Sequence, residues 1–184
     1  MHALCMRLFQ PLPRRIALSA ILLCLATALN AQTEKWTTYK YPADGFRVTF
    51  PSAPKLEPTQ KQAKAGTILM NSYCAQISTT NLCVAVIDHG PEATGLIPEI
   101  LMGRAKLGVL SAPKTRKLNQ VAIDLDGHKG IELEAESDTL HTITRIYIVG
   151  DVLYQTMVTY PVGNQYPRAN RFLDSFKFIE RVRK

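Results

Sequence analysis

The chain has 184 residues, and its 22 Lys+Arg against 15 Asp+Glu give a formal net charge of +7. Positive charge clusters on no single element outside the C-terminal residues 181–184, so the composition argues against a nucleic-acid-binding protein. No internal repeat or low-complexity linker divides the sequence, which excludes a repeat protein and favours one domain with a real hydrophobic core.

Residues 1–31 have the pattern of a secretory signal peptide. Arg7, Arg14 and Arg15 precede an apolar run over residues 16–28, and small residues follow. We expect cleavage after Ala28 or Ala31; a retained membrane anchor is the alternative, although the apolar run is short for a bilayer span. Cleavage leaves a net charge of +4. The protein is therefore predicted to be exported, either periplasmic or secreted, with no stable membrane span after processing.

The folded domain is expected over residues 32–180, followed by a solvated basic tail at 181–184. Residues 32–45 form an opening segment that should pack on the domain edge. Residues 46–50 alternate like a strand, and Pro51 stops that strand because it lacks a donor for the ladder. The polar residues 55–65 are expected to be an extended or irregular edge.

Two cysteines, Cys74 and Cys83, fall in the next predicted hairpin. Strands over residues 67–77 and 82–89 that close symmetrically about Ser78 and Thr79 place Cys74 directly across from Cys83. Opposed residues at a non-hydrogen-bonded position lie about 4.5 Å apart between Cα atoms, near the short end of disulfide reach. Since exported proteins fold under oxidising conditions, we predict a Cys74–Cys83 disulfide. Two buried free thiols are the alternative, and two cysteines supply too few ligands for a metal.

The first predicted helix covers residues 91–110 and carries an imperfect apolar stripe. Gly103 and Gly108 each weaken it by about 1 kcal/mol relative to Ala, and the expected benefit of these glycines is a close approach to the sheet. Strands follow at residues 121–125 and 131–136, separated by the turn Asp126-Gly127. Residues 131–136 alternate apolar and acidic side chains, which predicts one buried and one wet face.

A central hairpin is predicted from residues 142–149 and 152–160, joined by the two-residue turn Gly150-Asp151. Both of its faces are substantially apolar, so we expect the sheet to be covered on both sides. The last helix has apolar residues at i, i+3, i+4 and i+7, a stripe that should pack on the sheet through Phe172 and Phe176. The predicted fold class is α+β, a central antiparallel sheet with helices on both faces in an α/β/α sandwich.

Several segments together resemble a known family: residues 44–51 (D-G-F-R-V-T-F-P), residues 125–132 (L-D-G-H-K-G-I-E), residues 145–155 and residues 171–176 (R-F-L-D-S-F). They are similar to PsbP-like proteins, small exported bacterial proteins of uncharacterised function in a superfamily that includes the DcrB-like proteins. The resemblance covers roughly residues 36–180. It implies a PsbP-like sheet between helices, an exported location and no enzymatic activity. No binding residue is carried over, because the ion-handling residues of PsbP itself have no match in this chain.

His141, Arg145 and Tyr160 are the candidate ligand-binding residues. In the register of the central hairpin, His141 and Arg145 share a face and Tyr160 stands opposite His141. A cleft lined by these side chains would suit an anionic ligand, with the guanidinium as a two-pronged donor. The alternative is a polar patch at the end of the sheet, with Arg145 paired to an acid such as Glu132 or Glu134.

Two acidic features carry weaker predictions. Glu132, Glu134, Glu136 and Asp138 form an acidic edge, but steps of about 6.6 Å along a strand are wide for one Ca²⁺ ion, so a solvated face is favoured. Asp88 and His89 are adjacent in a strand and point to opposite faces, which prevents a catalytic pair. Asp88 should instead accept backbone N–H bonds at the following turn.

The sequence has no G-x-S-x-G elbow, phosphate loop, H-E-x-x-H helix or dinucleotide fingerprint. We therefore predict a non-enzymatic protein without cofactor or metal. The favoured function is a binding or accessory module that contacts another envelope or secreted protein, or an envelope component. The alternatives are a small hydrolase or ligand-binding protein that uses the His141/Arg145/Tyr160 surface, and a purely structural envelope protein.

Overall fold

A computed structural model describes residues 35–63, 66–90 and 98–182. The signal-peptide prediction for residues 1–31 lies outside the described residues, as does the first part of the predicted helix over residues 91–110. The elements in chain order are β1 (Thr37–Tyr41), β2 (Phe46–Phe50), β3 (Lys55–Ala63), β4 (Gly66–Ile77), β5 (Thr80–Asp88), α2 (Pro98–Leu110), β6 (Arg116–Leu125), β7 (His128–Glu136), β8 (Leu140–Val149), β9 (Val152–Pro161), α3 (Ala169–Ser175) and β10 (Lys177–Phe178).

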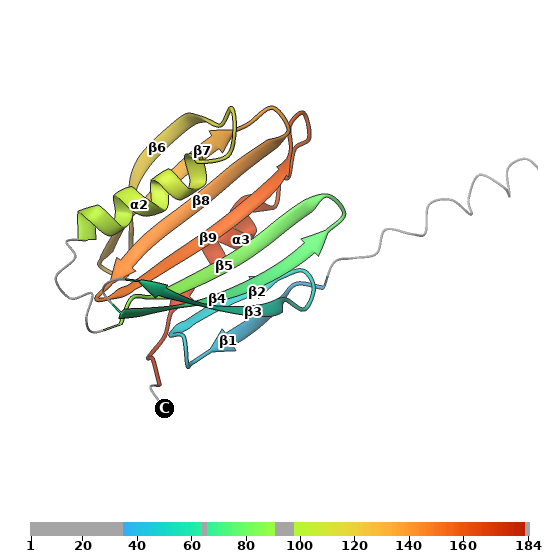
Figure 1. Cartoon of the computed structure of the whole chain (residues 1–184). Coiled ribbons are helices and arrows are strands. Elements are labelled where there is room, and N and C mark those ends of the chain that lie inside the picture. Colours follow the sequence, from blue (N-terminus) through green and yellow to red (C-terminus); the bar gives the residue numbers. More distant parts are fainter. Residues whose placement is uncertain (1–34, 64–65, 91–97, 183–184) are drawn as a thin grey trace, which may run out of the picture. The chain divides into compact units, whose positions relative to one another are not determined.

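Seven strands form one antiparallel sheet in the order β3-β4-β5-β9-β8-β7-β6 (Figure 1). Its centre is the predicted hairpin, with Val149 opposite Val152 and Tyr147 opposite Tyr154. Gly150 takes a φ of +62° at the turn, a conformation that glycine adopts without steric cost. The predicted register of the central hairpin is confirmed.

The hydrophobic core lies on one face of this large sheet. Tyr147 and Tyr154 project from the hairpin into the core, where their rings contact those of Phe176, which directly follows α3, and Phe178 on β10. Phe172 is 0% exposed and Phe176 is 1% exposed, so the predicted packing of the C-terminal helix is confirmed. The rings of Phe176 and Phe46 stack with centroids 5.6 Å apart, which connects that helix end to β2.

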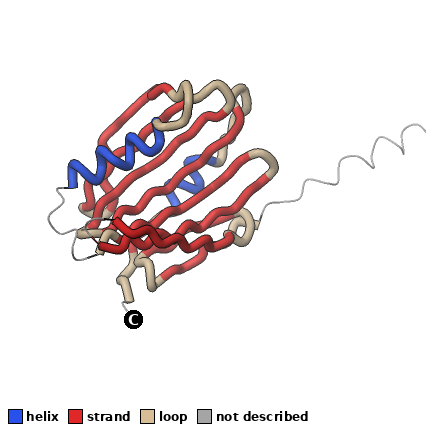
Figure 2. Tube along the Cα trace, in the orientation of Figure 1, coloured by secondary structure: helices blue, strands red, loops and turns tan. Residues whose placement is uncertain are grey.

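The predicted helix sandwich needs correction, because strands dominate the architecture (Figure 2). Helix α2 lies over β7 and β8 on one face, while short α3 lies behind the sheet (Figure 1). The core face is covered by α3 together with a second, three-stranded sheet in the order β1-β2-β10. β10 has two residues and pairs with β2, although the two strands lie near opposite ends of the sequence. Such a non-local pair leaves no periodic pattern in the sequence, which is why the second sheet was missed.

A buried carboxylate ties the small sheet to the large one. Asp44, at the turn before β2, is 6% exposed. Asn71 donates to both of its oxygens at 3.1 and 3.0 Å, and the Tyr73 hydroxyl donates to one of them. Burial and the bond to Asp44 raise the pKa of Tyr73, which keeps its donor proton in place. Because a buried charge is costly without partners, these donors hold the β1–β2 turn against β4.

Arg181 joins the same region from the C-terminus. Its Nε donates to the carbonyl of Ala43 at 3.0 Å, and its Nη2 donates to Asp88 Oδ2 at 2.7 Å. The next backbone N–H, that of Val182, donates to the carbonyl of Pro42 at 2.9 Å. Ordered contacts therefore continue beyond residue 180, where we placed the start of the solvated tail.

The glycines of the chain have different physical roles. Gly127 takes a φ of +84° in the β6–β7 turn. At Gly130, a Cβ atom would lie 2.5 Å from the Ile146 carbonyl oxygen and 2.5 Å from the Tyr147 ring, so only glycine fits against β8. At Gly103 and Gly108 no atom lies within 4 Å of such a Cβ. The expected close approach of α2 to the sheet at these two glycines is therefore wrong.

The Gly130→Ala variant should lose about 1–3 kcal/mol of unfolding free energy, because the new methyl group overlaps β8 backbone and ring atoms. Gly103→Ala is the matched control. It should gain up to about 1 kcal/mol through helix propensity alone, since its methyl group meets open space. Urea denaturation measures both values, and equal effects at the two positions would contradict this assignment.

The predicted disulfide is present. Cys74 stands opposite Cys83 in the β4–β5 ladder, and the two residues form a disulfide with Cα atoms 4.2 Å apart. Both residues are half-buried on the face of the large sheet that carries α2. The bridge closes a short loop, so its effect on the entropy of the unfolded chain is modest.

Replacing both Cys74 and Cys83 with Ser should lower the unfolding free energy by at most about 2–3 kcal/mol, the value for closing a loop of this length. Urea denaturation of the double variant against the unreduced parent measures this loss. Peptide mapping without reductant provides the covalent check. It should recover one linked pair of peptides, and alkylation of both cysteines in the folded parent would exclude the bridge.

Candidate functional site

The structure brings His141 and Tyr160 together near one end of the β8–β9 hairpin. The two residues are register partners, and their rings stack with centroids 4.9 Å apart and an interplanar angle of 23°. Arg145 lies four residues further along β8, opposite Thr156. Its guanidinium belongs to a different group of ion pairs, so the three candidate residues form two neighbouring polar clusters.

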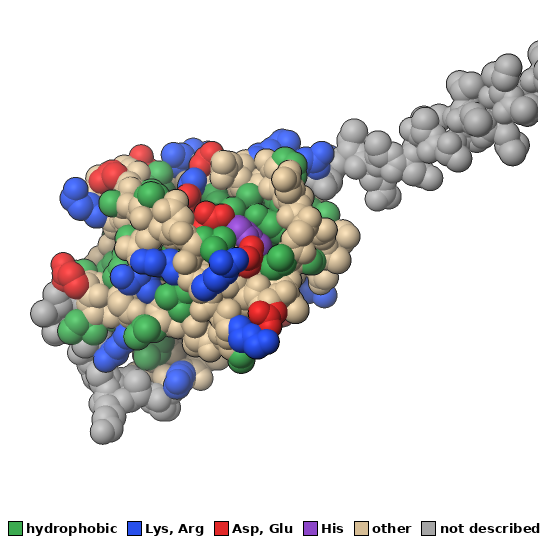
Figure 3. Space-filling view, turned by 90° about the horizontal axis from the view of Figure 1, so that it is seen from above, with side chains coloured by type: hydrophobic (Ala, Val, Ile, Leu, Met, Phe, Trp, Pro, Cys, Tyr) green, Lys and Arg blue, Asp and Glu red, His purple; other side chains and the backbone are tan. Residues whose placement is uncertain are grey.

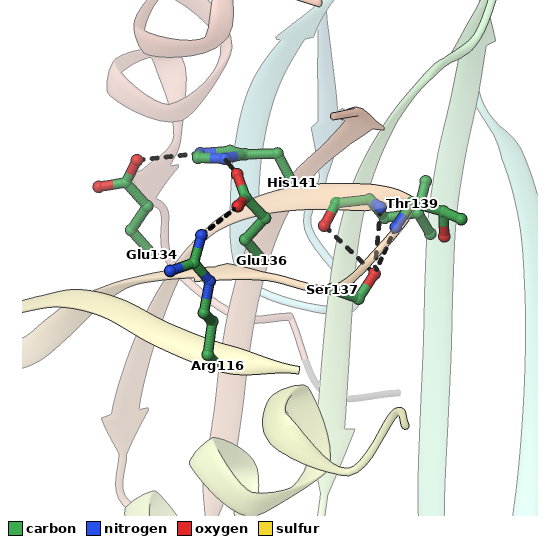
Figure 4. Close-up of polar contacts among 7 residues, drawn as sticks. Arg116, Glu134, Glu136, Ser137, Thr139 and His141 are labelled. Atoms are coloured by element: carbon green, nitrogen blue, oxygen red, sulfur yellow. Dashed lines mark hydrogen bonds and ion pairs between the residues drawn. The ribbon is translucent and has the colours of Figure 1, made fainter. Parts of the chain in front are cut away.

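His141 lies between two carboxylates from β7 (Figure 4). Its Nε2 is 2.9 Å from Glu134 Oε1, and its Nδ1 is 3.2 Å from Glu136 Oε2. Glu134 and Glu136 are two residues apart in a strand and therefore project on the same face. The contact of Nδ1 with Glu136 is a hydrogen bond, whereas that of Nε2 with Glu134 is a close approach without hydrogen-bond geometry.

Arg116 completes this His141 cluster from the edge strand β6. Its Nη2 lies 2.8 Å from Glu136 Oε1 (Figure 4). The hydrogen bond from Arg116, and next that from His141, lower the pKa of Glu136. Burial, followed by the charges of Glu134 and Glu136, raises the pKa of Tyr160. On the face that Figure 3 draws, a histidine lies beside acidic side chains, with Lys and Arg nearby.

Arg145 is held by two carboxylates from different elements. Its Nε lies 2.7 Å from Glu132 Oε2 on β7, and its Nη1 lies 2.7 Å from Asp174 Oδ1 on α3. Burial alone would lower the pKa of Arg145, but the hydrogen bonds to Glu132 and Asp174 outweigh it and raise that pKa. An anionic ligand would have to displace one of these carboxylates. The anion-binding role of His141, Arg145 and Tyr160 stays a prediction.

Side chains from neighbouring elements neutralise the acidic edge. Glu132 pairs with Arg145, Glu136 with Arg116, and Asp138 with Lys114 at 2.5 Å. Within residues 35–63, 66–90 and 98–182, no group of three or more His, Cys, Asp or Glu is arranged to hold a metal ion. The carboxylates of this edge are thus paired with basic side chains, of which Lys114 and Arg116 are themselves exposed to solvent.

Asp88 has the turn role that the sequence predicts. Its Oδ1 accepts the backbone N–H of Gly90 at 2.9 Å, and its Oδ2 accepts Arg181. His89 lines a cleft beside α2. Burial and the nearby charge of Arg104 lower the pKa of His89, an effect that Asp88 and Asp151 only partly oppose. The imidazole of His89 is therefore neutral at neutral pH.

Two clefts beside α2 are the features that sequence reasoning missed. The helix buries one residue, Leu101, and leaves Ile100 and Leu107 exposed. One cleft of about 550 Å³ lies toward the β6–β7 turn, and its lining includes Met102, Gly103, Lys106, Lys129 and Ile148. The other, of about 400 Å³, lies toward β9 and β5. The imperfect apolar stripe was the available signal, because it indicates a helix that covers its sheet incompletely.

Comparisons with known proteins identify a similar fold but indicate no function. No family model matches the chain, and no curated protein is similar to it. Among solved structures, the chain is similar to the cyanobacterial PsbP (CyanoP) of Synechocystis, with a TM-score of 0.50 and 14% identity over 81% of this chain and 95% of that one. The fold is PsbP-like. At this identity the similarity concerns the fold alone.

Two further solved structures have lower TM-scores and identities. One is a protein of unknown function from Pseudomonas aeruginosa, with a TM-score of 0.34 and 10% identity over 68% of this chain and 82% of that one. The other comes from Bacteroides thetaiotaomicron, with a TM-score of 0.37 and 11% identity over 77% and 47% of the two chains. Scores this low carry no argument about function.

Several residues in the segments that resemble PsbP-like proteins have a role in the fold. Asp44 is the buried carboxylate beside Tyr73, and Gly130 allows the approach of β7 to β8. Phe172 and Phe176 fill the core. Asp44, Phe172 and Phe176 belong neither to the His141 cluster nor to the lining of the two clefts beside α2, whereas Gly130 also lines the cleft toward the β6–β7 turn.

Arg116→Gln should raise the pKa of Glu136 toward its ordinary value of 4.5, because it removes the strongest of the effects that lower it. A carboxylate with a lowered pKa stabilises the fold above its unfolded pKa, and that contribution is lost as the pH falls through its folded pKa. The variant should therefore be less stable than the parent at pH 7, and the difference should vanish in acid. Carbon-13 NMR of the Glu136 carboxyl and urea denaturation across pH measure both effects.

Lys117→Gln is the matched control, since it removes the same charge from the next residue, which is not among the side chains that lower the pKa of Glu136. It should leave the Glu136 pKa unchanged. An equal shift in both variants would mean that general surface charge, and not the Arg116 contact, determines the pKa.

Proposed function

We propose that this protein is a non-catalytic accessory module that is exported and binds another exported protein through the free edge of β6. The observation that carries the proposal is the exposure of this strand. Residues 116–122 are all exposed, including the apolar Leu118 and Val121 at 40% and 43%. An uncovered edge strand presents unpaired N–H and C=O groups that can pair with an added strand.

The two edges of the large sheet differ in their protection. The β3 edge has Pro58 in its middle and lysines at positions 55 and 61, features that discourage strand addition. The β6 edge begins with two basic residues and an irregularity between Lys117 and Asn119. From there to Leu125 it has a single charge, that of Asp124, and no proline. This contrast favours β6 as the edge that receives a partner.

Export is supported by the signal-peptide pattern over residues 1–31 and by the Cys74–Cys83 disulfide, which suits an oxidising compartment. The proposal that the protein is not an enzyme is supported by the sequence, which lacks the common catalytic motifs. It is also supported by the ion pairs that already occupy Arg145. Among the described residues no helix is both long and apolar enough to cross a bilayer.

The test is site-specific photo-crosslinking in cells that express the full-length gene. A probe at Leu118 on β6 should capture one discrete protein, and Val121→Lys should abolish the adduct by adding a charge to the pairing edge. The same probe at Leu56 is the control, because Leu56 is 51% exposed on the opposite edge strand. Equal adducts from both positions, adducts that survive Val121→Lys, or capture of further copies of this chain alone would each overturn the proposal.

A further inference from the structure

The cleft between α2 and β9 is lined mainly by apolar side chains. Its volume of about 400 Å³ falls within the range of small-molecule sites in proteins. Strands β5 and β9 contribute the floor, and α2 contributes one wall. The apolar lining residues are Ile87, Leu153 and Met157 from the strands, and Leu101, Ala105 and Val109 from the helix.

The helix faces this cleft without filling it. Residues 101, 105, 108 and 109 lie on one side of α2 by helical periodicity, and all four line the cleft. Gly108 provides no side chain, and no atom lies within 4 Å of the position where its Cβ would be. The apolar side of α2 thus leaves open space above Leu153 and Met157.

Two polar groups at the cleft have unused hydrogen-bonding capacity. Arg104 lines the cleft, is exposed, and makes no ion pair or hydrogen bond with any residue that the structure describes. His89 Nε2 is buried and likewise lacks a partner among the described residues. Gln155 differs, because its amide already donates to Thr144 Oγ1 at 3.1 Å. A guanidinium and a neutral imidazole together offer donors for a carboxylate.

We infer that this cleft binds a free single-chain anionic amphiphile of the medium-chain carboxylate class. Its alkyl chain lies on Leu153 and Met157 under the open space at Gly108, and its carboxylate is bound by Arg104 and His89. One cation and a cleft of this size match one chain with one negative head group. The site is separate from the β6 edge, so it does not depend on the proposed function.

The first experiment fills the cleft. The probe is dodecanoate, and calorimetry measures its binding to delipidated protein produced from the full-length gene. Gly108→Leu places a side chain in the open space and should weaken binding at least tenfold. Gly103→Leu is the matched control, because it makes the same change in the same helix toward the other cleft. It should leave binding unchanged, and thermal melting of both variants checks that they fold.

The second experiment distinguishes the contribution of the charged head group to binding from that of the alkyl chain. Arg104→Gln should weaken dodecanoate binding about tenfold and leave the binding of dodecanol, which has no charge, unchanged. Vesicles of phosphatidylcholine with phosphatidylglycerol test the membrane alternative. The inference is overturned if dodecanoate does not bind the parent, if Gly108→Leu binds as well as the parent, or if both leucine variants lose binding equally. Binding to the vesicles without binding of monomeric dodecanoate would also overturn it.

Discussion

The fold depends on aromatic rings packed between its two sheets. Phe46 and Phe50 from β2 meet Phe176 and Phe172 from the C-terminal segment, with centroids 5.6 and 5.1 Å apart. Large buried rings contribute much of the hydrophobic free energy of a core. They also fix where α3 ends and β10 begins. The position of Asp174 on α3, and therefore its ion pair with Arg145, follows from this packing.

The two faces of the large sheet are covered to different degrees, and this asymmetry defines the functional possibilities. The core face is filled by β1, β2, β10 and α3, and the buried Asp44 holds this layer in place. On the other face, α2 is the one helix among the residues that the structure describes; it buries Leu101 and leaves a cleft on each side. A layer that packs so loosely leaves apolar surface for a ligand. The core face has a cleft of its own, of about 440 Å³, whose lining includes Arg145, Tyr147 and Phe176.

The environment of the β7 glutamates depends on the neighbouring strands. In the sequence, their alternation with apolar residues is typical of a strand with one solvent-exposed face. In the fold, each glutamate stands beside a basic side chain from another element: Arg145 and His141 on β8, and Arg116 on β6. Ion pairs at such partly exposed positions contribute little stability individually. These ion pairs instead position side chains: they hold the His141 ring against Tyr160 and engage the guanidinium of Arg145.

Local pattern alone determined the central hairpin, the Cys74–Cys83 pairing and the burial of Phe172 and Phe176. Each depends on a turn or a periodicity that lies within a few residues of the chain, such as the Gly150-Asp151 reversal. The second sheet, the pairing of Arg145 with Asp174 and the clefts beside α2 were decided only by the tertiary structure. Those features join residues far apart in sequence, for example β2 with β10. Local pattern also could not show that Gly103 and Gly108 face open space, because this depends on where the sheet lies relative to the helix.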